Sequence, residues 1–151
     1  MKRLLGKEKG KGKILDKNAL LSKEELEIVE VDLGKDEFVY VRQMTGHERD
    51  TFEKLLARKF KNEKGKYDYE MTLEDFRAKL AVHTVCDAEG VLLLQPTDYP
   101  KLSNSMSAAR LEKIINVAQR INAISEEDKE ELVKNLDADL VGNSSSDSVE
   151  N

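Results

Sequence analysis

Two short runs with the side-chain periodicity of β-strands lie close together near the start of the chain, and they constrain the fold more than any other feature. In the first run, residues 27–33, valine and leucine occupy every second position and acidic residues lie between them. Such alternation is typical of a strand with one buried and one solvated face. The second run, residues 38–42, is rich in β-branched and aromatic residues, and the intervening Gly-Lys-Asp at 34–36 suits a turn. The sequence therefore predicts an antiparallel β-hairpin.

Helical patterns follow this hairpin. Thr45 and Glu48 have the spacing of a capping box, in which each side chain accepts the other residue's backbone amide at a helix start. The helix that begins there has one apolar face, formed by Phe52, Leu55, Leu56 and Phe60. A charged loop is expected over residues 61–70. Thr72 with Asp75 predicts the cap of a second helix, whose inward side chains would be Phe76, Leu80 and Val82.

In the second half of the chain, a turn and a proline-containing segment precede another helical pattern. Residues 87–90, Asp-Ala-Glu-Gly, predict a turn, and residues 91–94 predict a short buried strand or an extended segment. Prolines break regular structure over residues 96–100 and leave room for one short turn. From about residue 105 a long helix is expected, with Leu111, Ile114, Ile115, Ala118 and Ile121 on one face.

Ser125 and Asp128 mark the start of a last helix, with an apolar stripe of Leu132, Val133 and Leu136. A stripe of three residues can pack on a partner as easily as on its own domain, so these three are the predicted partner-binding residues. With a short helical turn at 16–21 before the hairpin, the predicted fold class is α+β. It consists of an N-terminal antiparallel β-hairpin followed by about four α-helices.

Charge divides the chain into three parts. Residues 1–13 carry six basic residues and one acid, a net +5, whereas residues 126–151 carry nine acids and two lysines, a net −7. Segments so charged and so poor in apolar residues cannot bury enough surface to offset the entropy of ordering. We therefore expect a disordered basic arm at 1–13, one α+β domain at 14–136, and a disordered acidic tail at 137–151.

Composition favours a cytoplasmic protein. A single cysteine, Cys86, excludes an intramolecular disulfide framework and suits a reducing compartment. The longest purely apolar run, residues 91–94, is far too short to span a bilayer, and the first residues lack the apolar core of a secretory signal.

One group of residues, His83, Cys86 and Asp87, is a weak candidate for a catalytic site. On a helix, a histidine and a cysteine three residues apart can touch, but no second histidine or asparagine lies nearby to orient them. Burial of Cys86 as a small apolar side chain and a turn at Asp87 explain the same residues more simply. The sequence therefore indicates that the protein is not an enzyme.

Metal and cofactor sites are not expected either. His47 lies among charged residues in the first turn of a helix, where a solvated surface role is favoured. Two separated histidines and one cysteine do not supply the four ligands of a structural zinc site. The loop after Asp87 lacks the regular oxygen ligands and the closing glutamate of a calcium loop. The glycines of the arm have no adjacent strand and helix to cradle a phosphate.

Over roughly residues 16–138, several short motifs follow one another in an order that is similar to that of a known protein family. The hairpin runs directly into Val-Arg-Gln-Met-Thr-Gly-His-Glu-Arg-Asp at 41–50, and Asp-Phe-Arg-Ala-Lys-Leu-Ala-Val-His-Thr-Val-Cys-Asp-Ala-Glu-Gly follows at 75–90. After the proline-containing segment come Ala-Gln-Arg-Ile-Asn-Ala-Ile-Ser-Glu-Glu-Asp at 118–128 and Lys-Asn-Leu at 134–136. This order resembles the tail assembly chaperones of long-tailed bacteriophages and related prophages.

The resemblance implies a protein without enzymatic activity, cofactor or catalytic residues, working in the cytoplasm of a bacterial host. Its partners would be the tape-measure protein, which it keeps soluble, and the tail tube protein, whose polymerisation around the tape measure it promotes. Members of the family also tend to self-associate, and many of their genes yield a longer frameshifted product. The basic arm at 1–13 has no counterpart in that pattern.

Two other classes of function stay open at this stage. A DNA-associated accessory protein would use the basic arm, and its binding would weaken steeply with salt. Nucleic-acid binding is disfavoured because the arm lacks aromatic residues for base stacking and the rest of the chain is acidic. A minor structural component of a phage tail would be found in purified virions, where a chaperone would be absent.

Overall fold

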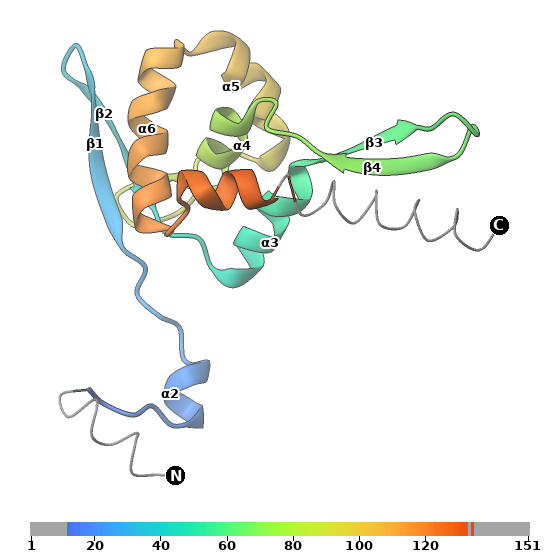
Figure 1. The fold of residues 1–151 in the computed structure, drawn as a ribbon. Coiled ribbons are helices and arrows are strands. Elements are labelled where there is room, and N and C mark those ends of the chain that lie inside the picture. The colour runs from blue at the N-terminus through green and yellow to red at the C-terminus, as the bar shows by residue number, and fades with distance from the viewer. Residues whose placement is uncertain (1–11, 133, 135–151) are drawn as a thin grey trace.

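The computed structural model describes residues 12–132 and residue 134. Figure 1 shows a body of helices packed beside a small sheet, with two elements that project from it. The elements in chain order are α2 (Lys17–Leu21), β1 (Ile28–Gly34), β2 (Glu37–Arg42), α3 (Gly46–Leu55), β3 (Ala57–Lys61), β4 (Tyr67–Met71), α4 (Phe76–Val82), β5 (Val85–Cys86), the 3-10 helix η1 (Pro96–Asp98), α5 (Tyr99–Ser105) and α6 (Ala108–Ile121). Residues 126–132 are helical as well. The protein is α+β, as the sequence predicts.

The predicted hairpin is present as β1 and β2. The two strands are antiparallel, and β5 pairs with the other side of β2, which gives the sheet order β1-β2-β5. Lys35 and Asp36 at the turn have φ angles of 57° and 61°. Positive φ at both central positions is the pattern of a type I′ turn, whose twist matches that of the paired strands. Val31 lies opposite Val39 on the face of the sheet that points into the protein.

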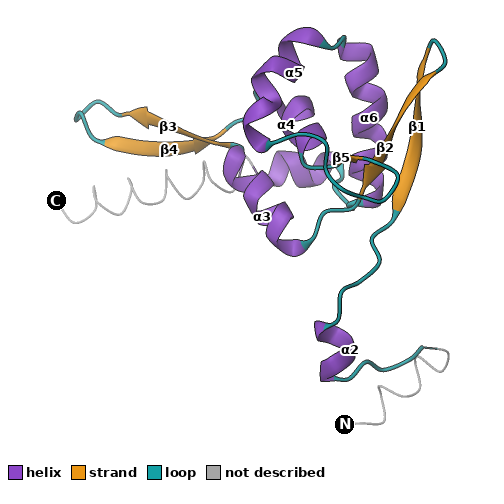
Figure 2. Cartoon of the chain, turned by 180° about the vertical axis from the view of Figure 1, so that it is seen from behind, coloured by secondary structure: helices purple, strands orange, loops and turns teal. Residues whose placement is uncertain are grey.

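The core lies between this face of the sheet and the helices. α6 packs against β1 and β2 and also against α4, so it is the central helix of the body (Figure 2). The predicted apolar face of α6 is confirmed, since all five of its members are buried. The largest fully buried side chains include Phe52, Leu56, Leu80, Ile114 and Ile115.

Hydrogen bonds tie the end of β2 to the end of α6. The Gln43 amide donates to the carbonyl of Ile121 at 3.1 Å, and the Met44 backbone N–H donates to the Asn122 side chain at 2.7 Å. The Arg49 guanidinium on α3 donates to the carbonyl of Asn122 at 3.1 Å. The bonds from Gln43 and Arg49 satisfy backbone carbonyls that α6 leaves free at its C-terminus, and all three bonds fix where α3 begins.

A second hairpin is the main departure from the predicted fold. β3 and β4 pair along their whole length, from Ala57 opposite Met71 to Lys61 opposite Tyr67. The prediction of a charged loop at 61–70 is therefore wrong. Tyr67 and Tyr69 have the period-two spacing of a strand, but the many charged residues around them favoured the prediction of a loop. α3 ends at Leu55, so Phe60 lies in a strand instead of on the helix face.

Of the three helix caps predicted from the sequence, two are present and one is not. The capping box of Thr45 and Glu48 is confirmed, and Ser125 and Asp128 also bond each other's backbone amides. The cap predicted for α4 is wrong: Asp75 has a left-handed backbone, with φ 56°, and its carboxylate accepts a bond from Ser103 at 2.7 Å instead.

Three further predictions concern α2, the segment at 91–94 and the two ends of the chain. The short helical turn predicted at 16–21 is confirmed as α2, whose N-terminus is capped by Asp16 at 2.9 Å. Residues 91–94 are extended, with Leu92 bridged to Cys86, so the second of the two alternatives for this segment holds. The predicted acidic tail at 137–151 and residues 1–11 of the predicted basic arm lie outside the described residues.

Candidate functional site

The candidate nucleophile cluster is part of the packed body. His83 follows α4 and is 3% exposed, with Nδ1 2.8 Å from the Lys79 carbonyl and its ring edge-to-face with Phe52. Cys86 is buried in β5, and burial raises the pKa of its thiol. The protonated form, which is a poor nucleophile, is therefore favoured. Asp87 accepts the backbone amides of Glu89 and Val91, both at 2.9 Å. The predicted core role of Cys86 and turn role of Asp87 are confirmed.

Metal-ligating residues are not gathered in the described part of the chain. No group of three or more histidine, cysteine or acidic side chains there lies close enough to hold an ion. His47 is exposed in the first turn of α3, as predicted.

Arg42 and Glu48 form a half-buried ion pair that was not predicted from the sequence. Both guanidinium NH2 groups donate to the carboxylate, at 2.9 and 2.8 Å, and one of them also donates to the Gln43 carbonyl at 2.8 Å. The Arg42 side chain is 9% exposed. The hydrogen bonds from Arg42 hold the pKa of Glu48 below its usual range. The pair joins the end of β2 to the first turn of α3.

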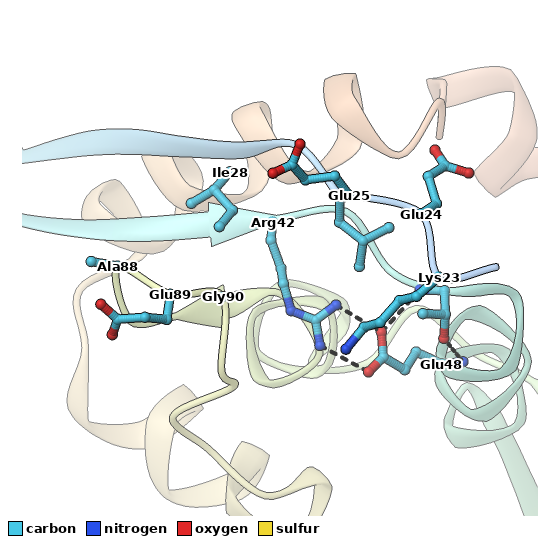
Figure 3. A pocket seen from close by; sticks show the side chains of 11 residues that line it. Lys23, Glu24, Glu25, Ile28, Arg42, Glu48, Ala88, Glu89 and Gly90 are labelled. Atoms are coloured by element: carbon cyan, nitrogen blue, oxygen red, sulfur yellow. Dashed lines mark hydrogen bonds and ion pairs between the residues drawn. The ribbon is translucent and has the colours of Figure 1, made fainter.

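This pair lies in a hollow of about 740 Å³, shown in Figure 3. The walls come from the segment before β1, the end of β2, the start of α3 and the turn at 88–90. Lys23 and four glutamates line it beside Arg42, so its charge is mixed. The hollow contains no nucleophile with a neighbouring base, and its chemistry is that of a polar surface groove.

The segment before β1 presents apolar side chains to solvent. None of the residues of α2 is buried. Ile14 is 92% exposed, Leu15 51%, Leu20 66% and Leu21 75%. Figures 1 and 2 show α2 standing apart from the body, at the end of an extended connection. We call residues 12–26 the N-terminal projection.

The second projecting element is the β3–β4 ribbon, residues 57–71. Directly opposed residues share a face and neighbours along a strand alternate. One face therefore carries Lys59, Lys61, Tyr67 and Tyr69, and we call these four residues the cationic face. All four are exposed, and the Lys59 ammonium lies 4.2 Å from the centre of the Tyr67 ring.

The opposite face of the ribbon holds the acids of the two strands. Asp68 and Glu70 lie there with Arg58, and Arg58 is paired with Glu70. Acidic side chains within β3 and β4 are thus confined to one face, and the cationic face has none. The sequence signal that could have found this arrangement is the alternation of tyrosine with acid over residues 67–70.

The predicted partner-binding stripe begins on the body. Leu132 is half-buried and packs against the hydrophobic core. On the same helical segment, the Lys129 ammonium lies 4.8 Å from the centre of the Phe76 ring. Val133 and Leu136 lie outside the described residues, so partner binding by this stripe stays a prediction.

Comparison of the chain with protein-family models, with curated proteins and with solved structures found no match. Among the helices that the structure describes, none combines the length and apolar character needed to cross a membrane. The assignment of a function therefore depends on the residue order and on the exposed surfaces described above.

Proposed function

We propose that this protein is a tail assembly chaperone of a long-tailed bacteriophage or prophage. In this role it binds the tape-measure protein, keeps it soluble, and promotes polymerisation of the tail tube protein around it. The order of motifs over residues 16–138 supports this assignment.

The apolar surface of the N-terminal projection is the single observation that carries the proposal. A chaperone for a long, apolar, helical client must present apolar side chains reversibly, without burying them in its own core. Leu20 and Leu21 lie side by side on α2 and are both largely exposed. An isolated helix of five residues is too short to be stable in water by itself, so α2 gains order when its apolar side chains contact a partner.

High surface charge is the second requirement of this role. Charged residues make up 36% of the chain, and the net charge is −5. A net charge far from zero keeps a protein and its complexes soluble. The same chain thus combines a short apolar contact surface with a body that resists aggregation.

The experiment that tests the proposal is co-expression with the tape-measure protein, the proposed client. The wild-type chain is expected to move the tape-measure protein into the soluble fraction and to co-purify with it. The double substitution Leu20→Asp and Leu21→Asp is expected to abolish both effects, because it places charge on the apolar contact surface.

A matched control replaces two exposed apolar residues elsewhere, Val91→Asp and Leu93→Asp, and is expected to behave as wild type. If the tape-measure protein is equally insoluble with and without the wild-type chain, and the two never co-purify, the proposed function is wrong. If the control variant loses activity as completely as the α2 variant, the assignment of the contact to α2 is wrong.

A further inference from the structure

Three strand edges in the described part of the chain are open. β1 is the outer strand of the three-stranded sheet, and no described strand pairs with its other side. β3 and β4 form a two-stranded sheet, so each has an open edge as well. Open edges present unpaired backbone N–H and C=O groups and pair readily with another chain.

The hydrogen-bond pattern identifies which residues face these edges. Gln43 donates to the Glu27 carbonyl, so Glu27 bonds toward β2, and in a regular antiparallel pair the residues that bond inward alternate with those that bond outward. The backbone groups of Ile28, Glu30 and Asp32 therefore face the open edge. By the same reasoning from the bond between Asn62 and Lys66, the backbone groups of Lys59 and Lys61 face the open edge of β3.

The side chains of these outward-bonding residues have opposite charges on the two edges. Glu30 and Asp32 are exposed on the face of the sheet that α6 does not cover. Lys59 and Lys61 are exposed on the cationic face of the ribbon. None of these four side chains takes part in an ion pair with another described residue at short range.

We propose that the β3 edge of one copy of this protein pairs with the β1 edge of a second copy, which joins the ribbon and the sheet into one antiparallel sheet. The partner is thus a second copy of this chain, and charge complementarity between the two edges selects it. This inference stands on strand geometry and does not require the chaperone role.

One antiparallel register places both charge pairs directly opposite each other, Glu30 with Lys61 and Asp32 with Lys59. Directly opposed residues share a face, and their α-carbons lie about 5.5 Å apart when they are hydrogen-bonded to each other. Opposite charges at such positions stabilise strand pairing, whereas like charges destabilise it. Each charge pair would be flanked by aromatic residues, giving the rows Tyr40–Glu30–Lys61–Tyr67 and Phe38–Asp32–Lys59–Tyr69 across the joined sheet.

The same charges disfavour the symmetric alternatives. Pairing β1 with β1 would place acid near acid, and pairing β3 with β3 would place lysine near lysine. The contact is therefore heterologous, with a different surface on each copy. Heterologous contacts build rings or open chains instead of closed dimers.

The test is the oligomeric state of the full chain, measured by light scattering after size-exclusion chromatography on nuclease-treated protein. At low ionic strength, where surface charges are least screened, the wild type is expected to have at least twice the chain mass of 17.1 kDa. Lys59→Glu with Lys61→Glu, and separately Glu30→Lys with Asp32→Lys, are each expected to give the chain mass alone. An equimolar mixture of the two variants is expected to assemble again, because the reversed edges complement each other.

The control Lys54→Glu with Lys101→Glu makes the same change in net charge as Lys59→Glu with Lys61→Glu, at exposed positions on α3 and α5, and it is expected to assemble as wild type. Recovery in the mixture shows that both variants fold. A wild type with the mass of a single chain at every concentration and ionic strength overturns the proposal. Assembly that survives both charge reversals, that fails to return in the mixture, or that disappears on nuclease treatment also overturns it.

Discussion

The body and the two projections of this protein follow different physical rules. In the body, apolar side chains from β1, β2, α3, α4 and α6 are buried against each other. In the N-terminal projection and the β3–β4 ribbon, large apolar and aromatic side chains are exposed to solvent. The body is therefore stabilised by its own packing, whereas the projections leave side chains of the same kinds in contact with solvent.

Local stability differs in the same way. A two-stranded ribbon is marginally stable without further strands or packing, and a five-residue helix is less stable still. The ribbon is continuous with the body through α3 and α4, and Met71 packs against the core at its base. We therefore expect stability to decrease from the body to the ribbon and from the ribbon to α2.

The largest expected contrast is between two leucines replaced by the same residue. Leu80 on α4 is fully buried, and Leu80→Ala is expected to lower the free energy of unfolding by about 2–5 kcal/mol, because it removes buried methyl groups and leaves a cavity. Leu21→Ala on α2 is the matched control and is expected to change it by less than about 0.5 kcal/mol. Urea unfolding of both variants measures the contrast, and equal losses would contradict it.

A smaller effect is expected at the ion pair between Arg42 and Glu48. Glu48→Gln leaves the buried guanidinium without its charged acceptor, at a cost of about 1–3 kcal/mol at neutral pH. The control Glu53→Gln removes a more exposed pair with Arg49 and should cost less than about 1 kcal/mol. Thermal unfolding of the two variants tests this ranking.

The pH dependence of the same variant gives a second readout. Because the folded-state pKa of Glu48 is lowered, the stability from this pair is fully present above the usual carboxyl range and is lost as pH falls through the folded-state value. The difference between wild type and Glu48→Gln should therefore shrink as the solution is acidified. A difference that stays constant down to strongly acidic pH would show that the charge of Glu48 contributes nothing.

The smallest expected effect on stability is on the ribbon. Tyr69→Ala removes an exposed side chain that lies opposite Lys59, and such a cross-strand pair contributes about 0.2–1 kcal/mol. Global unfolding should shift by no more than this. A loss as large as that of Leu80→Ala would mean that the ribbon belongs energetically to the body.

Sequence patterns predicted the body better than the projections, for a physical reason. Period-two and helical patterns are clear where one face is buried, as in β1 and α6. The ribbon was missed because both of its faces carry charged residues, so its alternation does not separate apolar from polar positions. The ion pair of Arg42 was missed because its two residues lie six positions apart on different elements, and only the turn between β2 and α3 brings them together.

The most direct measurement of the difference between body and projections is amide hydrogen exchange of the full chain, free and mixed with the tape-measure protein, its proposed partner. In the free protein, residues 12–26 should exchange fastest, the ribbon at an intermediate rate, and α4 and α6 slowest. On binding, added protection should appear in residues 12–26, while α4 and α6 stay as they are. Added protection confined to α4 and α6, or slow exchange of residues 12–26 in the free chain, would contradict the account.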